Sequence, residues 1–375
     1  MRVLLAGGGT GGHLFPAIAI ARELSRLDPS GQIEFVGTRY GIEYGMKDQI
    51  GYPLALIAMR GLARRLSLTL FAFPFRFVVS IMQALRICSR FRPDVVVGTG
   101  GYVSGPVIIA ASIKGIPRAM QEQNSYPGLV TRKLAARADV VFIAYKKAQE
   151  YLPAGTRCEF YGNPVRSDIA SGTRAEALKK FNLRDDRKTI LILGGSQGAR
   201  RINQAVLDSL DCLDENIQLL WQSGKRDYTE VASRLDKKDF AVALFPFCNE
   251  MELVYAAADL AVARAGALTL AELTACGVPS LLIPFPQAAA DHQTHNAAEV
   301  VAAGAAEMIP DTELDNIKLL QKSVEIVRSD RLSHMANAAR KLGRPHAAAE
   351  IAQEILNLAA SKGAHRDRTD AGPDR

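Results

Sequence analysis

The sequence predicts an α/β protein with two Rossmann-like, doubly wound domains, each built on a parallel β-sheet. The first observation is that short runs of Val, Ile and Leu alternate with helical stretches, which is the pattern of βαβ units. The second is that an apolar run is twice followed by a glycine-rich turn, in "VLLAGGGTGGHLFP" (3–16) and in "TILILGGSQGARRINQAV" (189–206). The third is the length of 375 residues, which is comfortable for two domains.

The strands of the first half are predicted from apolar runs that do not alternate with polar residues, as in strands covered by helices on both faces. We expect them at residues 2–6, 33–37, 54–58, 94–98, 118–122 and 139–144. Helices are expected between these runs, for example in "AIAIARELSRL" at 17–27.

The second half begins after residues 162–187, a polar stretch rich in turn-forming residues that predicts a domain boundary. We expect its strands at residues 189–193, 219–222, 241–245, 259–266 and 280–284. The chain is therefore divided into an N-terminal domain at 1–163, a C-terminal domain at 164–345, a helix at 346–363 and a tail at 364–375. The helix is expected to pack back on the N-terminal domain, and the polar tail is expected to be disordered.

Composition narrows the class of protein without choosing a function. The chain is 48% hydrophobic and 23% charged, which predicts a well-packed core, and its net charge of +7 favours acidic partners such as nucleic acid, anionic lipid or phosphorylated substrates. The 5 cysteines form no C-x-x-C pair and have no histidine at metal-ligand spacing, so we expect reduced thiols and no metal. We expect neither a signal peptide nor a membrane-spanning helix, because no apolar run is long enough.

Both glycine turns stand where a strand meets a helix N-terminus, which offers backbone N–H groups and a positive dipole end to an anion. Gly7, Gly9 and Gly12 fit the G-x-G-x-x-G spacing of a dinucleotide site. The acidic residue that should hold a ribose at the end of the second strand is missing, because Thr38 and Arg39 stand there. The turn therefore favours a phosphate-bearing ligand over NAD, and the absence of G-K-[ST] excludes a P-loop. A turn needed only for packing is the alternative, and it is less favoured for two matched turns.

Six motifs in order give the chain a recognisable signature: "GGGTGGH" (7–13), "GTGGYVSGP" (98–106), "EQN" (122–124), "GNPVR" (162–166), "GGSQGARRIN" (194–203) and "RAGALTLAELTACGVPSLLIPFP" (264–286). In this order and spacing the chain resembles the MurG family of N-acetylglucosamine transferases from residue 1 to about 355. The resemblance implies a GT-B fold, with two Rossmann-like domains facing across a cleft, the N-terminal one for the acceptor and the C-terminal one for UDP-N-acetylglucosamine. It implies an inverting transfer of N-acetylglucosamine to the undecaprenyl-linked acceptor lipid I, which gives lipid II in peptidoglycan synthesis, without a cofactor.

The resemblance also implies roles for residues of the N-terminal domain. The first turn faces the acceptor pyrophosphate and donor sugar through Thr10, Gly11 and Gly12. His13 is the candidate general base, since imidazole titrates near neutral pH, although it could instead hydrogen-bond substrate or cap the loop. The acceptor side is lined by Gly100, Gly101 and Tyr102, and Asn124 lies near the donor sugar.

Residues of the C-terminal domain are implied to bind the donor. These residues are Arg166, Ser196 at a donor phosphate, Cys248 beside the uracil, Ala267, Leu268, Thr269, Leu270 and Ala271 in the donor loop, Glu272 at the ribose and Gln293 at the sugar hydroxyls. Glu272 could alternatively be a solvated helix residue. No D-x-D motif is present, so we expect backbone N–H groups, Ser196 and a nearby arginine to stabilise the leaving diphosphate without a metal. Gln121, Ala265 and His292 depart from residues common in the family.

Residues 60–92 combine an aromatic and aliphatic run with flanking arginines, and Pro74 and Arg76 interrupt it. A helix buried on the sheet is one interpretation, and a patch that lies on an anionic membrane surface is the other. The candidate contact residues are Leu68, Leu70, Phe71, Phe73 and Phe75. The resemblance implies a peripheral position on the cytoplasmic face of the inner membrane, with other cell-wall synthesis proteins as partners and no nucleic acid.

Two other functions stay open at this point. One is a UDP-N-acetylglucosamine 2-epimerase, which shares the two-domain architecture but needs neither an acceptor loop nor an apolar surface. The other is a non-catalytic nucleotide-sugar-binding protein on the membrane. The intact glycine turns and Glu272 disfavour the second interpretation.

Overall fold

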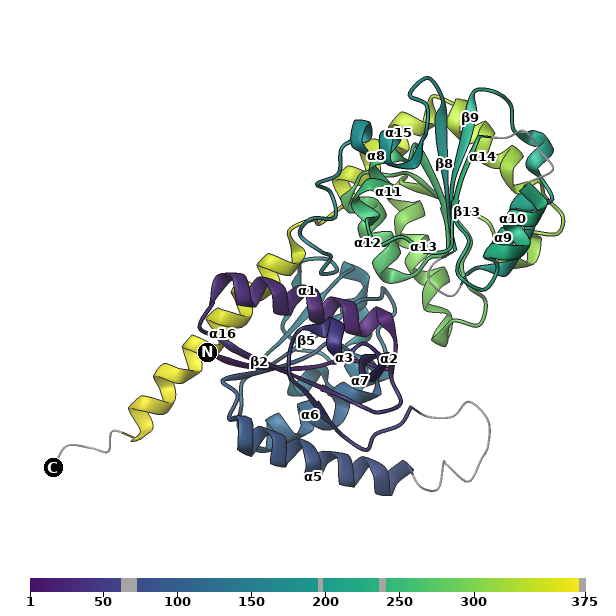
Figure 1. Ribbon diagram of the computed structural model, residues 1–375. Coiled ribbons are helices and arrows are strands. Elements are labelled where there is room, and N and C mark those ends of the chain that lie inside the picture. Colours follow the sequence, from purple (N-terminus) through teal and green to yellow (C-terminus); the bar gives the residue numbers. More distant parts are fainter. Residues whose placement is uncertain (62–72, 195–197, 236–240, 371–375) are drawn as a thin grey trace. The chain divides into compact units, whose positions relative to one another are not determined.

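The computed structural model describes residues 1–61, 73–194, 198–235 and 241–370 (Figure 1). The chain divides into two compact units. Unit 1 consists of Met1–Val165 together with His346–Arg375, and unit 2 consists of Arg166–Pro345. Unit 1 is therefore built from both ends of the chain, and unit 2 from the middle.

Unit 1 contains a parallel sheet of seven strands in the order β3-β2-β1-β4-β5-β6-β7. Its strands are β1 (Arg2–Ala6), β2 (Gln32–Gly37), β3 (Leu54–Leu56), β4 (Val95–Gly98), β5 (Arg118–Glu122), β6 (Val140–Ile143) and β7 (Cys158–Phe160). The central strand β4 is apolar throughout, and β1 beside it is apolar apart from Arg2, because both faces of the sheet are covered.

Helices cover the two faces of this sheet, and side chains along β1 point alternately to one and the other. The main helices of unit 1 are α1 (Gly11–Leu27), α5 (Phe73–Phe91), α6 (Gly101–Ile113) and α16 (Ala347–Asp370); the short ones are α2 (Ile42–Gly45), α3 (Lys47–Ile50) and α7 (Leu129–Leu134). Val3 and Leu5 pack with α1 and α16, whereas Leu4 and Ala6 pack with α5 and α6. Figure 1 shows α16 alongside α1.

Unit 2 contains a parallel sheet of six strands in the order β10-β9-β8-β11-β12-β13. Its strands are β8 (Lys188–Leu193), β9 (Ile217–Gln222), β10 (Val242–Phe245), β11 (Leu260–Ala263), β12 (Ser280–Leu282) and β13 (Ala306–Met308). Its helices are α8 (Arg174–Phe181), α9 (Arg200–Leu207), α10 (Tyr228–Leu235), α11 (Met251–Ala257), α12 (Ala267–Ala275), α13 (His292–Ala302), α14 (Leu319–Arg328) and α15 (Arg331–Leu342). One face of the sheet packs with α9, α10 and α14.

Within each unit, the order of the strands places a glycine turn at a switch point of the sheet. In unit 1 the order reverses between β1 and β4, where Ala6 pairs with Gly98. In unit 2 it reverses between β8 and β11, where Leu193 pairs with Ala263. Ligands of such sheets bind where two neighbouring connections diverge in this way, outside the carboxyl ends of the strands. Each switch point thus lies beside one of the two glycine turns.

The predicted fold class of two doubly wound parallel sheets is confirmed. All the predicted strands are present, and β7 and β13 at the sheet edges are additional. The strand expected at 259–266 ends at Ala263, because the chain turns there into α12. Helix α16 runs to Asp370 and so enters the segment 364–375, for which the sequence predicts disorder. Extending an existing helix avoids the cost of nucleating one. No helix in the described part of the chain is long and apolar enough to cross a bilayer.

Candidate active site

The loops that follow β1 and β4 interlock at the switch point of unit 1. The Thr99 hydroxyl donates to the His13 carbonyl at 2.8 Å. Gly100 and Gly101 have φ of 95° and 74°, a region that favours glycine. A Cβ at Gly100 would lie 2.7 Å from the His13 ring, and one at Gly101 would lie 2.6 Å from the Gly8 carbonyl. The structure therefore brings His13 and the predicted acceptor loop together, and these two positions require glycine for a close approach.

The side chain of Thr10 contacts the His13 imidazole instead of capping helix α1. Its Oγ1 lies 3.0 Å from Nδ1 of His13, and Thr10 is the N-cap residue of α1 without a side-chain cap hydrogen bond. A helix leaves its first N–H groups without partners inside the helix. The N-terminus of α1, at Gly11 and Gly12, is therefore open to an anion, while Thr10 fixes the orientation of the imidazole.

Tyr102 lies against the first glycine turn. A Cβ at Gly9 would fall 2.7 Å from its ring, and one at Gly61 would fall 3.1 Å from it. The Tyr102 hydroxyl and the Thr38 hydroxyl are 3.4 Å apart. The aromatic ring therefore fills the space that these two glycines leave, next to the predicted acceptor side.

Asn124 is held by a neighbour that the sequence analysis did not assign. Oε1 of Glu122 accepts from the backbone N–H and the side-chain amide of Asn124 at 3.0 and 3.1 Å. Oε2 of Glu122 accepts from Gly128 N–H at 3.0 Å. Gln121, which departs from the family pattern, is fully buried and donates to Asn163 at 3.1 Å. Gln121 is thus part of the interior, whereas Glu122 orients Asn124.

Asn203 on α9, the helix that follows the second glycine turn, is held by buried hydrogen bonds to the end of β9 and the loop after it. The Asn203 amide donates to Ser223 O and to Asp227 at 2.9 Å each, and it accepts from Trp221 Nε1 at 3.0 Å. All of these contacts are buried. They fix the start of α9 relative to β9. Ser196, the residue predicted at a donor phosphate, lies outside the described residues.

Glu272 of α12 lies in a cluster with Tyr255 of α11 and Arg166. The buried Tyr255 hydroxyl donates to Oε2 of Glu272 at 2.7 Å. Burial raises the pKa of the Glu272 carboxyl above its ordinary value, against the opposing effects of this hydrogen bond and of the Arg166 charge. Burial, followed by the Glu272 charge, also raises the pKa of Tyr255 well above its ordinary value. Arg166 pairs with Glu252 at 2.7 Å. Sequence reasoning missed Tyr255 because a tyrosine among apolar helix residues is typical of a core position.

Other predicted donor residues are distributed around the same end of the sheet of unit 2. Ala267, Leu268 and Thr269 form the first turn of α12, but the side chain of Leu270 is buried in the core. Leu270 can therefore offer a ligand only its backbone.

Two further predicted donor residues engage side chains or backbone of unit 2. Cys248 N–H donates to the Gln222 side chain at 2.9 Å. Oε1 of Gln293 accepts from Phe285 N–H at 2.9 Å, which ties α13 to the loop after β12. Cys248 and Gln293 are thus each fixed by a hydrogen bond to a neighbouring segment of unit 2.

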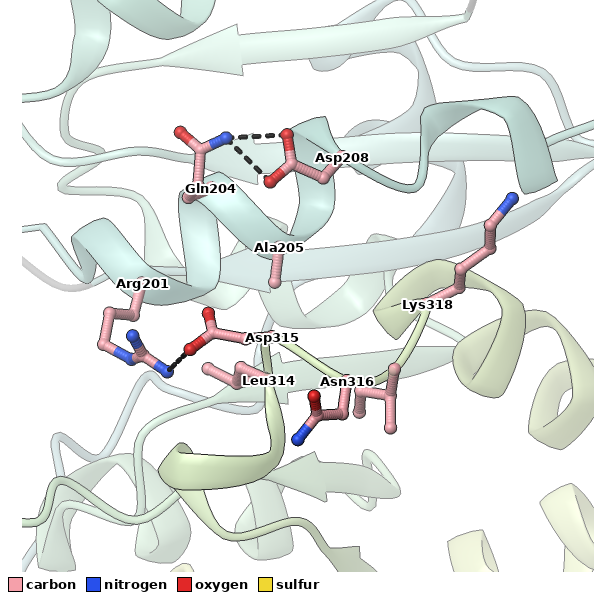
Figure 2. A pocket seen from close by; sticks show the side chains of 9 residues that line it. Arg201, Gln204, Ala205, Asp208, Leu314, Asp315, Asn316 and Lys318 are labelled. Carbon is pink, nitrogen blue, oxygen red and sulfur yellow. Dashed lines mark hydrogen bonds and ion pairs between the residues drawn. The ribbon is translucent and has the colours of Figure 1, made fainter.

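A cavity of about 400 Å³ lies elsewhere in unit 2, and Figure 2 shows the residues that line it. It lies between α9 and the segment before α14, and no predicted site residue lines it. Arg201 pairs there with Asp315 at 3.1 Å, and Gln204 donates to Asp208. Lys318 pairs with Asp211 and Asp208 pairs with Arg234, so each charged side chain that lines the cavity is engaged in an ion pair. Among the described residues, no group of three or more His, Cys, Asp or Glu could hold a metal ion.

Comparison with known proteins places this geometry in a family. The model of the glycosyltransferase family 28 N-terminal domain matches residues 3–143, and that of the family 28 C-terminal domain matches residues 189–355. A UDP-N-acetylglucosamine--N-acetylmuramyl-(pentapeptide) pyrophosphoryl-undecaprenol N-acetylglucosamine transferase of Chlorobaculum parvum is 43% identical over 96% of this chain and 100% of its own length.

Two solved structures show how far the likeness extends in three dimensions. The crystal structure of Acinetobacter baumannii MurG is 29% identical, with a TM-score of 0.78, over 95% of this chain and 99% of its own. A UDP-GlcNAc 2-epimerase from Neisseria meningitidis has a TM-score of 0.64 at 17% identity, over 95% of this chain and 99% of its own, which shows a shared fold alone. The full-length likeness and the paired domain models show that this chain belongs to the MurG family of N-acetylglucosamine transferases, within glycosyltransferase family 28.

Proposed function

We propose that this chain transfers N-acetylglucosamine from UDP-N-acetylglucosamine to the muramyl sugar of undecaprenyl-pyrophosphoryl-MurNAc-pentapeptide, which turns lipid I into lipid II. The observation that carries the proposal is the full-length match to transferases named for this reaction, at 43% identity. The geometry is consistent with it, because each unit presents a glycine turn at a sheet switch point, beside residues that can hold a phosphate or a sugar.

The acceptor is assigned to unit 1. The open N-terminus of α1 at Gly11 and Gly12 suits the acceptor pyrophosphate, because N–H groups and the helix dipole both favour an anion there. Thr10 adds a hydroxyl to the same place. Gly100 and Gly101 lie against the His13 ring and Tyr102 lies against Gly9, and these three residues are assigned as the acceptor wall. These residues come from the connections after β1 and β4, which the sheet places side by side.

The donor is assigned to unit 2. A carboxylate that accepts two ribose hydroxyls is apt for Glu272, which Tyr255 already holds in place. The first turn of α12 and the second glycine turn, with Ser196, are assigned to the UDP diphosphate, since helix N-termini stabilise the charge that develops on a leaving group. Arg166, Cys248 and Gln293 complete the donor side, and Asn124 of unit 1 is assigned to the donor sugar.

We assign His13 as the general base of an inverting displacement. A hydroxyl of the muramyl sugar attacks the anomeric carbon of N-acetylglucosamine, the bond from that carbon to the UDP oxygen breaks, and the hydroxyl proton passes to the imidazole. UDP leaves with the bonding electron pair. The contact between Thr10 and Nδ1 orients the ring, so Nε2 is the nitrogen assigned to the proton transfer.

A membrane-facing surface is proposed on the exposed side of α5. Leu68, Leu70 and Phe71 lie outside the described residues, and Phe73 is partly buried against Phe77. Phe75, Val78 and Met82 are 73%, 54% and 47% exposed, at spacings that place them on one helix face. Arg86 is exposed one turn further along. An apolar stripe with a basic neighbour suits an anionic bilayer surface, and the polyprenyl-linked acceptor requires such contact. We infer a peripheral position on the cytoplasmic face of the inner membrane, near other cell-wall synthesis proteins.

This surface is tested by flotation with anionic vesicles at low salt. The triple variant Phe75→Ser, Val78→Ser, Met82→Ser is expected to float poorly, because lipid contact by apolar side chains is lost. Ile113→Ser is the matched control, since Ile113 is also an exposed apolar residue of unit 1, at the end of α6. Equal flotation of both variants would remove α5 from the membrane contact.

The reaction itself is tested with radiolabelled UDP-N-acetylglucosamine and a lipid I analogue. We expect labelled lipid product only when both substrates are present. An epimerase would instead convert UDP-N-acetylglucosamine without an acceptor, and a non-catalytic binding protein would retain the nucleotide sugar unchanged. Either of these two results would refute the proposed transfer.

A further inference from the structure

Glu43 is a buried carboxylate beside the first glycine turn, and the proposed reaction gives it no role. Its residue is 1% exposed and lies on the short helix α2. Oε2 accepts from Gly9 N–H at 2.8 Å. Oε1 accepts from Thr38 N–H at 2.8 Å and from the Thr38 hydroxyl at 3.1 Å. Within the described residues Glu43 has no ion-pair partner, and three hydrogen-bond donors satisfy its two oxygens.

The Glu43 side chain fills the space in which a Cβ would lie at three neighbouring glycines. A Cβ at Gly8 would fall 2.6 Å from the Glu43 carboxyl carbon. A Cβ at Gly37 or Gly41 would also collide with the Glu43 side chain. Gly8 belongs to the glycine motif that resembles a dinucleotide turn, where a glycine allows close approach of a ligand. Here the group that approaches Gly8 belongs to the protein itself.

The remaining glycines of the motif then divide into two sets. A Cβ at Gly7 would collide with Thr99, and one at Gly9 would press on Tyr102, so both positions face protein. At Gly12 the only neighbour of a Cβ would be the Thr10 hydroxyl, at 3.8 Å. A Cβ at Gly11 would lie 2.9 Å from the Phe15 ring, so the glycine of the motif that faces open space is Gly12, in the second half of the turn. Gly7, Gly8 and Gly9 form the protein side.

We propose that Glu43 is a positioning residue that acts as a built-in anion for the first half of the glycine turn. It occupies the Gly9 N–H and fixes the chain that leads into α1, which leaves the N–H groups at Gly11 and Gly12 for the acceptor pyrophosphate. Through Thr38, whose hydroxyl also lies near Tyr102, it ties the acceptor wall to the same turn. This inference rests on the proposed function, since it concerns the acceptor half of that site.

The charge of Glu43 matters because only a carboxylate can accept from all three donors. A glutamine has one acceptor oxygen, and its NH₂ group would have to face either Gly9 N–H or the donors of Thr38. A donor placed against a donor leaves buried groups without partners, and the turn must shift to relieve them. The shift would appear first at the N-terminus of α1.

The test is steady-state kinetics of Glu43→Gln with the lipid I analogue and UDP-N-acetylglucosamine. We expect the KM for the acceptor to rise about 10- to 100-fold, while the Kd of UDP-N-acetylglucosamine, which binds in unit 2, changes less than about twofold. Glu23→Gln is the matched control, because Glu23 is also a buried glutamate of unit 1, paired with Arg26 at 2.8 Å. It is expected to keep the wild-type acceptor KM.

A second pair of variants keeps the proposal testable if Glu43→Gln does not fold. Thr38→Val removes one donor to Glu43, and Thr38→Ser retains it, so only Thr38→Val should raise the acceptor KM. An unchanged acceptor KM in Glu43→Gln, or equal values in the two Thr38 variants, would overturn the proposal.

A third readout does not depend on turnover. Hydrogen exchange in the peptide that spans residues 3–16 should quicken in Glu43→Gln and not in Glu23→Gln. If the wild-type chain binds UDP-N-acetylglucosamine but transfers nothing, the proposed function fails while this readout still tests Glu43. Equal exchange in both variants would then remove its positioning role.

Discussion

Replacing Tyr255 by Phe removes one hydroxyl from the side of Glu272 and leaves the rest of the donor cluster in place. In the wild-type chain this hydroxyl donates to the Glu272 carboxylate at 2.7 Å, and it helps to keep the carboxylate charged against the effect of burial. Phe fits the space of the buried tyrosine ring. The change therefore tests one hydrogen bond rather than the packing of α11.

The expected magnitude follows from the kind of bond that is lost. A hydrogen bond to a charged group contributes about 1.5–3 kcal/mol. Part of this free energy is recovered when water or the ribose occupies the vacated site. We therefore expect donor binding to weaken by about 1–2 kcal/mol, which corresponds to a rise of roughly 5- to 30-fold in the donor KM. The kcat should change little, since Glu272 is assigned to the ribose and not to the reacting bond.

The pH dependence gives a second signature with a defined sign. Glu272 can accept ribose hydroxyls on both oxygens only when it is ionised, so donor affinity is lost as the pH falls through its pKa. Burial raises that pKa above its ordinary value, and Tyr255 opposes the rise. Without the hydroxyl the pKa rises further, so Tyr255→Phe should lose donor affinity at a higher pH than the wild type does.

The assay is isothermal titration of UDP-N-acetylglucosamine across a pH series, together with donor KM at fixed acceptor. Tyr228→Phe on α10 of the same unit is the control for removal of a tyrosine hydroxyl. If Tyr255→Phe binds the donor as the wild type does at every pH, the hydrogen bond does not position Glu272. If kcat falls while the donor KM stays constant, the assignment of Glu272 to the ribose is wrong.

Three further predictions concern His13, Glu272 and the thiols. His13→Ala should lower turnover by roughly 100-fold or more at saturating substrates if the imidazole takes the proton, and a loss below tenfold would refute the base role. Glu272→Gln should weaken donor binding and raise the melting temperature, and the rise should be larger at pH 8 than at pH 5. Folding raises the pKa of the Glu272 carboxyl, so this group stabilises the native state below its unfolded pKa. That contribution is lost as the pH rises through the folded pKa, and a neutral glutamine does not lose it. Burial raises the pKa of Cys88 to about 11 and that of Cys276 to about 12, so neither should react with iodoacetamide at pH 7.5 until the chain unfolds; rapid labelling of the folded chain at either residue contradicts this.

The fold could be predicted from the sequence because its signals are local and repeated. Apolar runs without alternation mark the buried strands, and two strand-to-helix turns rich in glycine mark the two sheets. Strands β7 (Cys158–Phe160) and β13 (Ala306–Met308) were not predicted, because each has only three residues with a glutamate at its centre and lies at a sheet edge. Such segments become strands only through pairing with a neighbour, which no local pattern records.

The site could be predicted only as far as family motifs reached. His13, Gly100 and Gly101 do meet at the switch point. The partners that hold the predicted residues come from elsewhere in the chain: Tyr255 reaches Glu272 across 17 positions, and Glu43 reaches Gly9 across 34. In sequence Tyr255 looks like a core residue and Glu43 like a surface one. Tertiary packing alone decides that each contacts a functional segment.

Helix α16 has a consequence for how the chain is made. Its residues Ile351, Ile355 and Leu358 complete the core that α1 shares with the sheet of unit 1, yet they are synthesised after all of unit 2. At about 5–20 residues per second, the ribosome needs roughly 10–40 s to pass from the end of the first segment of unit 1 to this helix. During that interval unit 2 can fold to completion. The first segment of unit 1 meanwhile exposes the apolar surface of α1 and the sheet that α16 will cover. A chaperone that binds exposed apolar surface would find its target there, and truncation before residue 346 would make that exposure permanent.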